Sequence, residues 1–117
     1  MKSKALTKAQ QRKQVPLFTG LVKYFPDALW AVAKCSQAGY DQHEYTGPMV
    51  WDRSKSSDEH DALLRHLFEC GVVDDDEVRH SAKVAWRALA MLQKELEENG
   101  EAPLSPHNVK RKKKNKK

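Results

Sequence analysis

Apolar residues recur at helical spacing over Val78–Leu96, the longest segment without Gly or Pro that has a regular apolar period. The apolar positions step by four and three residues, as on one face of an α-helix: Val78, Ala82, Ala85, Leu89, Leu92 and Leu96. Neighbouring apolar residues widen this face to about half of the circumference. Such a helix needs neighbours on more than one side, so we expect it at the centre of a bundle or shared with a second subunit.

Two shorter helices are predicted before it. The first begins at Pro26, which suits the first helical position, and ends at Gly39. The second begins within 56–58, carries its apolar face on residues 62–68 and ends at Gly71. The acidic run Asp74–Glu77 is expected to begin the third helix, because acids stabilise the positive end of a helix.

No segment has the alternating pattern of a strand, so the predicted fold class is all-α. We expect a small three-helix bundle with an apolar N-terminal lead-in over 16–25, completed by dimerisation. The predicted loop Tyr40–Ser57 is longer than a simple helix connection needs. It contains two Tyr, a Trp and a His, a composition that argues against plain disorder and favours a function for the loop.

Charge divides the chain into three parts. Residues 1–16 contain five Lys/Arg and residues 110–117 contain seven, with no acid in either segment. The remaining body has nine Lys/Arg against sixteen Asp/Glu, so it is acidic although the whole chain has a net charge of +5. We therefore expect a basic disordered arm over 1–15, a helical domain over 16–100, and a Pro-containing linker with a basic tail over 101–117.

The composition also limits the location of the protein. No run of 18 apolar residues occurs, so we expect no membrane contact. The basic N-terminus is followed by no long apolar segment, so a secretory signal is not predicted. Cys35 and Cys70 are too far apart for a metal-binding knuckle and fall on apolar helix positions. Reduced, buried cysteines of this kind indicate a cytoplasmic protein.

Basic residues form the first candidate site. His80, Lys83 and Arg87 share one helix face, where their donors can bind phosphate oxygens. Further cations of the same kind come earlier in the chain: Arg53 and Lys55 in the long loop, and Arg65 and His66 in the second helix. The alternative is that the basic line is simply the water-facing side of the helix. A cationic cluster across the turn between the second and third helices would instead be an anion site.

Carboxylates and a loop tryptophan supply the other candidates. Asp58 and Asp61 are spaced by three residues, and Mg²⁺ is commonly held by one or two carboxylates together with substrate phosphates. Capping is the alternative for such acids, and it explains Asp74–Glu77 better. Trp51 can stack on a base. The basic C-terminal tail can bind polyanions weakly, or it serves solubility alone.

Four segments also occur in a familiar order: YFPDALWAVAK, WDRSKS, DALLRHL and RHSAKVAWRALAMLQKEL. Over residues 16–98 they resemble a phage and prophage family, the dATP/dGTP diphosphohydrolase N-terminal domain. Its members are grouped loosely with the MazG-type all-α nucleotide pyrophosphohydrolases. The resemblance implies Mg²⁺-dependent (or Mn²⁺-dependent) hydrolysis of a purine deoxynucleoside triphosphate to monophosphate and pyrophosphate. It places the nucleotide between the three helices, beneath the long loop.

The residue chemistry and the resemblance together give the expected residue roles. Asp61, alone or with Asp58, would hold the metal, and His66 or His80 would activate water, so His66, His80 and Asp61 are the expected catalytic residues. Substrate-binding residues would be Trp51 for the base and a set of cations for the phosphates: Arg53, Lys55, Arg65, Lys83 and Arg87.

This chain departs from the MazG pattern, because Lys83 and Arg87 stand where that pattern needs acids. The departure keeps two alternatives open: a non-catalytic protein that sequesters a nucleotide, and a nucleic-acid-associated protein that acts through its basic tails. As the preferred reading, we expect a dimeric phage enzyme of purine nucleotide metabolism in the host cytoplasm.

Overall fold

A computed structural model describes residues 5–53, 58–103 and 107–108 of the chain. Within these ranges the protein is helical apart from two short paired strands, which confirms the all-α fold class. The elements in chain order are α1 (Lys8–Gln14), the single-turn π-helix η1 (Phe18–Val22), α2 (Pro26–Gln42), β1 (Trp51–Asp52), α3 (Glu59–Leu67), α4 (His80–Glu98) and β2 (His107–Asn108). No helix in the described ranges is both long and apolar enough to cross a membrane.

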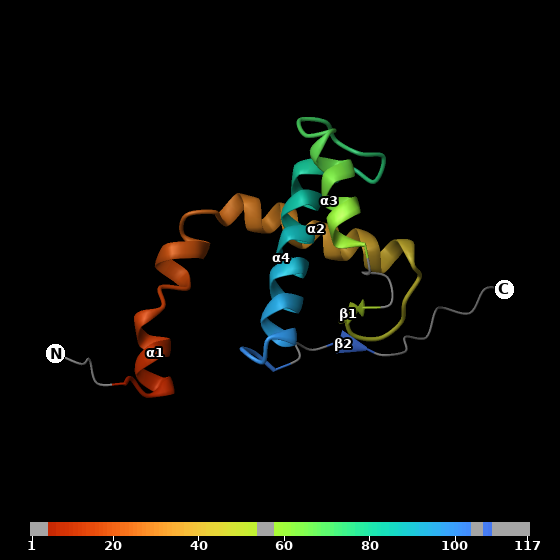
Figure 1. Ribbon diagram of the computed structural model, residues 1–117. Coiled ribbons are helices and arrows are strands. Elements are labelled where there is room, and N and C mark those ends of the chain that lie inside the picture. The colour runs from red at the N-terminus through yellow and green to blue at the C-terminus, as the bar shows by residue number, and fades with distance from the viewer. Residues whose placement is uncertain (1–4, 54–57, 104–106, 109–117) are drawn as a thin grey trace.

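Helix α4 occupies the centre of the molecule, as its wide apolar face predicts. Helix α3 runs beside it and α2 crosses it, whereas α1 lies apart at the N-terminal end (Figure 1). The indole Nε1 of Trp86 on α4 donates a hydrogen bond of 3.0 Å to Ser36 Oγ on α2. On the other side, Glu59 of α3 forms an ion pair of 2.9 Å with Lys94 of α4. Polar contacts therefore fix both neighbours of α4.

The third helix begins later than the sequence predicts. Residues 74–78 form a tight turn closed by hydrogen bonds from Asp74 N to Val78 O and from Glu77 N to Asp74 O. Glu77 has a φ of 65°, a left-handed conformation that cannot belong to an α-helix. The acidic run was therefore wrongly assigned to the first helical turn. Acids suit such a turn as well as a helix start, and the tertiary contact of Asp74 with Lys83 selects the turn.

Two further predictions about helices differ from the structure. Helix α2 continues through Gly39 to Gln42, because an interior Gly costs a long helix only about 1 kcal/mol. Part of the expected irregular N-terminal arm is helix α1. A reciprocal pair of hydrogen bonds between Thr7 and Gln10 caps its first turn, and this capping box outweighs the lack of an apolar period.

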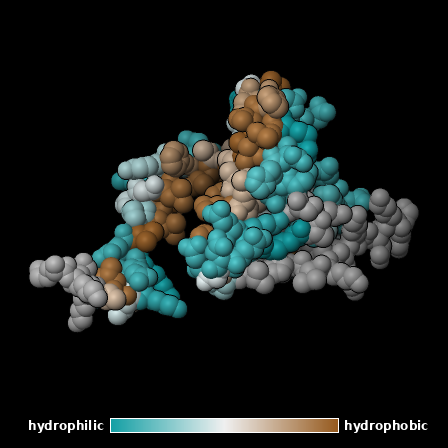
Figure 2. Space-filling model, viewed as in Figure 1, coloured by the Kyte–Doolittle hydropathy of each residue, from teal (hydrophilic) through white to brown (hydrophobic). Residues whose placement is uncertain are grey.

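The burial of the two faces of α4 differs from the prediction, because the basic face is covered and part of the apolar face is exposed. The basic line is not the water-facing side: His80 is buried, and Lys83, Arg87 and Lys94 are largely covered by α3 and the acidic turn. By contrast, Leu89 and Leu92 of the apolar stripe are half exposed. Figure 2 shows apolar surface gathered in the hollow between the N-terminal elements and α4. The described chain alone therefore does not cover the apolar stripe.

Candidate functional site

A cavity of about 900 Å³ lies between α2 and α4 and is bordered by the segment that joins α2 to β1. Its size falls within the range of small-molecule sites. The walls are mostly apolar and include Leu29 and Val32 of α2 and Leu89 of α4. Polar side chains complete the lining, among them His66 and Lys83. Apolar walls with a small set of polar groups are typical of ligand sites.

Lys83 and Arg87 bring positive charge to the cavity, and both are held by carboxylates. Lys83 Nζ lies 2.7 Å from Asp74 Oδ2 and 2.8 Å from Asp76 Oδ2. Arg87 Nη1 lies 3.6 Å from the buried Glu59 and 3.9 Å from an oxygen of Asp58. These pairs fix the cations against α3 and the turn, and they also neutralise part of the charge that a phosphate would meet.

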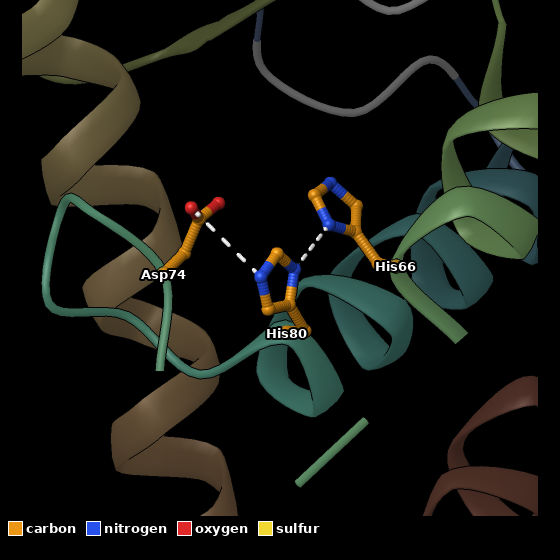
Figure 3. A group of neighbouring side chains, drawn as sticks. All are labelled: His66, Asp74 and His80. Atoms are coloured by element: carbon orange, nitrogen blue, oxygen red, sulfur yellow. Dashed lines mark hydrogen bonds and ion pairs between the residues drawn. The ribbon is translucent and has the colours of Figure 1, made fainter. Parts of the chain in front are cut away.

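A pair of histidines stands beside these cations. His66 near the end of α3 and His80 at the start of α4 face each other with their Nδ1 atoms 2.9 Å apart. Asp74 lies on the opposite side of the His80 ring, its Oδ1 3.8 Å from His80 Nε2, as Figure 3 shows. The turn brings Asp74 back over α4 through the bridge between Val73 and Arg79. His66, His80 and Asp74 thus form one cluster, which we call the histidine cluster.

The electrostatics of the site follow from these contacts. A hydrogen bond from Lys83 is the main cause that lowers the pKa of Asp74 to about 2. Burial alone would lower the pKa of Lys83, but its hydrogen bonds with Asp74 and Asp76 outweigh burial and raise it. Burial, helped by the charge of Lys83, lowers the pKa of His66. Burial also raises the pKa of the Cys35 thiol in the cavity wall. At neutral pH the site therefore combines a charged Lys83–Asp74 pair with a neutral His66.

The aromatic wall of the cavity is built from two tryptophans. Trp51 of β1 meets Trp86 of α4 edge to face, with ring centroids 5.8 Å apart. The guanidinium of Arg53 lies 4.0 Å from the centroid of the Trp51 ring and pairs with Glu97 at 2.8 Å. The nitrogens Trp51 Nε1 and Arg87 Nη1 are buried and have no hydrogen-bond partner among the residues that the structure describes. Both side chains line the cavity, but these two nitrogens are themselves buried, and Arg87 Nη1 faces the carboxylates of Glu59 and Asp58.

The structure brings together only some of the predicted site residues. Trp51, His66, Lys83 and Arg87 line the cavity, and His80 contacts His66 beside it. Arg53 lies behind Trp51, against the end of α4. Arg65 is exposed and pairs with Asp58 at 3.0 Å. Lys55 falls outside the described residues.

The predicted Mg²⁺ ligands do not form a cation site in this arrangement. The carboxylate of Asp58 contacts the guanidinium groups of Arg65 and Arg87, so its oxygens already neutralise two cations. Asp61 is exposed on α3 and is not among the residues that line the cavity. The assignment of Mg²⁺ to Asp58 and Asp61 stays a prediction, and these contacts do not favour it.

Sequence reasoning missed several residues of the site. Asp74 and Asp76 were assigned to a helix start, although an acidic run just before a basic helix face also predicts ion pairs across a turn. Ser36 and Trp86 have no sequence signal that pairs them, and only the crossing of α2 over α4 brings them together. The burial of Glu59 between α3 and α4 likewise depends on the tertiary fold.

Comparison with known proteins identifies the family. The family model described as dATP/dGTP diphosphohydrolase, N-terminal, matches residues 3–103. The chain therefore belongs to this family, which confirms the resemblance found in its four ordered segments. No curated protein and no solved structure matches the chain.

Proposed function

We propose that this member of the dATP/dGTP diphosphohydrolase N-terminal family binds a purine (deoxy)nucleoside triphosphate in the α2–α4 cavity. It hydrolyses the triphosphate to monophosphate and pyrophosphate. The observation that supports the proposal best is that a cavity of nucleotide size is lined both by the aromatic pair Trp51 and Trp86 and by the cations Lys83 and Arg87. A purine can pack on the aromatic rings and a triphosphate carries anionic oxygens for the cations, so one ligand suits both parts of the lining.

The proposed roles follow from position. The base lies toward the aromatic wall of Trp51 and Trp86, where apolar side chains replace water around it. The phosphates lie toward Arg87 and Lys83, whose positive charges stabilise the charge that develops on the leaving pyrophosphate. The attacking water lies near His66, the histidine that both lines the cavity and contacts His80.

The test is incubation of the full chain with dATP, dGTP, ATP and GTP in the presence of Mg²⁺ or Mn²⁺, followed by chromatography of the products. We expect monophosphate and pyrophosphate in equal amounts from at least one purine nucleotide. The variant Arg87→Lys keeps the positive charge but loses the planar guanidinium group with its several N–H donors. It should lower kcat/KM by about 100-fold, the cost of removing one preorganised donor. The matched control is Arg79→Lys, at an exposed position just before the same helix.

Asp61→Ala separates the Mg²⁺ prediction from the cavity proposal. Loss of turnover with unchanged helical content would support Asp61 as a metal ligand. Full turnover in Asp61→Ala together with the expected loss in Arg87→Lys would remove Asp61 from the site and keep the cavity. Equal activity of Arg87→Lys and Arg79→Lys would contradict the cavity proposal.

The second candidate function is nucleotide binding without turnover. It is favoured because Lys83 and Arg87 line the cavity as cations, while the carboxylates of Asp74 and Glu59 are held in ion pairs with them. Such a site can bind a polyphosphate without offering carboxylates to a catalytic metal. In that case a nucleotide raises the melting temperature of the protein, EDTA does not abolish this shift, and no monophosphate forms. Turnover in the nucleotide panel would exclude this candidate.

Dimerisation is part of the proposal. Large apolar side chains remain exposed on three elements: Phe18 and Leu21 of η1, Trp30 of α2, and Leu89 and Leu92 of α4. A monomer rarely exposes so many large apolar groups on neighbouring elements. Because Leu89 and Leu92 also line the cavity, a second copy docked there would close it as well. Light scattering coupled to size exclusion should give the mass of two chains.

We further propose that residues 16–100 form the nucleotide-binding unit, flanked by the basic segments 1–15 and 101–117. The tail over 110–117 would bind polyanions weakly. Deletion of 110–117, which keeps the pairing of β2 with Trp51 and Asp52, should then remove any binding of single-stranded DNA at low salt and leave nucleotide hydrolysis unchanged. Loss of hydrolysis in the deleted protein would contradict this division. The proposed setting is the cytoplasm of a phage-infected host.

A further inference from the structure

The histidine cluster contains more converging donor atoms than a general base needs. One donor atom from each of His66, Asp74 and His80 can be chosen so that all three lie within 4.8 Å of one another. The rings of His66 and His80 are tilted by 34° with their centroids 5.1 Å apart, and their Nδ1 atoms face each other, whereas Asp74 faces Nε2 of His80. Figure 3 shows that the three side chains come from α3, the acidic turn and α4, and meet at the junction of these elements.

The separations match the requirements of a metal ion. With metal–nitrogen bonds of about 2.1 Å, two nitrogens 2.9 Å apart subtend an angle of about 90° at the metal. This is the angle between neighbouring ligands of an octahedral ion, and a shift of about 0.5 Å opens it to a tetrahedral angle. Two donors on opposite sides of such an ion are about 4.2 Å apart, and one donor atom from each residue lies within 4.8 Å of the others. Asp74 faces Nε2 of His80, so the His80 ring must rotate for Asp74 to join an ion held by the two Nδ1 atoms.

The charge around the cluster also favours a cation. Asp74 and Glu69 place two carboxylates near His80, and Lys83 lies between Asp74 and a third carboxylate, that of Asp76. Asp74 uses Oδ2 for Lys83, and its Oδ1 faces His80. Burial of His80, whose exposed fraction is 5%, fixes one ligand before a metal arrives, which lowers the entropy cost of binding.

We propose that His66, His80 and Asp74 form a binding site for a first-row transition-metal dication of the Zn²⁺ or Co²⁺ class. Two imidazoles with one carboxylate suit such ions, whereas Mg²⁺ prefers oxygen ligands alone. Three protein ligands leave coordination positions open, and a bound metal of this kind lowers the pKa of a water ligand. Because His66 also lines the cavity, that water would lie within reach of a ligand bound there. The site goes beyond the proposed function, since metal binding requires no nucleotide.

The experiment is a titration of metal-free full-length protein with Co²⁺, followed by visible absorption and by equilibrium dialysis. We expect one Co²⁺ per chain, displaced by Zn²⁺ and not by the same concentration of Mg²⁺. The variant Asp74→Asn should weaken Co²⁺ binding by at least about tenfold, as expected for loss of a ligand rather than of an outer contact. Its matched control is Asp76→Asn, which removes the same charge from the same Lys83 partner and should have a smaller effect.

A second pair of variants keeps the test decisive if Asp74→Asn disturbs the turn. His66→Gln removes a half-buried ligand, and His60→Gln removes an exposed histidine from the same helix. Far-UV circular dichroism reports whether each variant is folded. Absence of a Co²⁺ band in the parent protein would overturn the proposal and leave a shared proton as the cause of the 2.9 Å contact. The proposal would also be overturned if the two variants of either pair lost Co²⁺ affinity equally, or if neither pair lost any Co²⁺ affinity.

Discussion

Glu59 offers the sharpest test of how α3 is held against α4. Its side chain is buried, with an exposed fraction of 7%, and it lies 2.9 Å from Lys94 Nζ and 3.6 Å from Arg87 Nη1. Glu59→Gln keeps the shape of the side chain and removes its charge. The change leaves two cations facing a neutral amide on the inner side of the helix pair. We expect it to lower the free energy of unfolding.

The magnitude follows from burial. Removing one partner of a fully buried ion pair costs about 3–5 kcal/mol, because the other charge stays desolvated. Here Lys94 and Arg87 are 22% and 23% exposed, so both can recover part of their hydration. We therefore expect a loss of about 2–4 kcal/mol. Because His66 and His80 are held on the same two helices, the loss should also loosen the histidine cluster.

The assay is urea unfolding followed by far-UV circular dichroism. The matched control is Asp61→Asn, which removes a charge from the first turn of the same helix at an exposed position and should change stability by less than about 0.5 kcal/mol. The double variant Glu59→Gln with Lys94→Met should recover part of the loss, because Arg87 is then the one remaining cation of the two that faced Glu59. A loss for Glu59→Gln no larger than that for Asp61→Asn would refute this account of the α3–α4 contact.

Three further predictions follow from single positions. Gly39 lies inside α2 and an added Cβ meets nothing within 4 Å, so Gly39→Ala should raise the free energy of unfolding by about 0.5–1 kcal/mol. Gly71 has a φ of +96°, so Gly71→Ala should lower the free energy of unfolding. Ser36→Ala should cost about 1–3 kcal/mol in urea unfolding by leaving the indole nitrogen of Trp86 without its acceptor. Leu92→Asp should convert the proposed dimer to a monomer in light scattering, and a dimer that survives this change would place the contact elsewhere.

The sequence by itself determined the helices and the central one among them. The apolar period of 78–96 and the low strand propensity lead to an all-α fold, because these are local properties that a helix satisfies with its own backbone. The four ordered segments also determined the family. Local patterns failed at α1, which has no apolar period, and where one residue type suits two structures. The acids of 74–77 favour a helix start and a turn equally, and the interior Gly39 resembles a helix end.

The tertiary structure decided which residues form the site. The cations of α4 could face water or protein, and only the packing of α3 and the acidic turn shows that Lys83 and Arg87 are paired and partly buried. His66 and His80 are fourteen residues apart on two helices, so their 2.9 Å contact depends on the register between those helices. Helical periodicity fixes which residues share a face of one helix, but it contains no information about which face of another helix lies opposite. That choice depends on packing between distant segments, and it gives this chain its cavity and its histidine cluster.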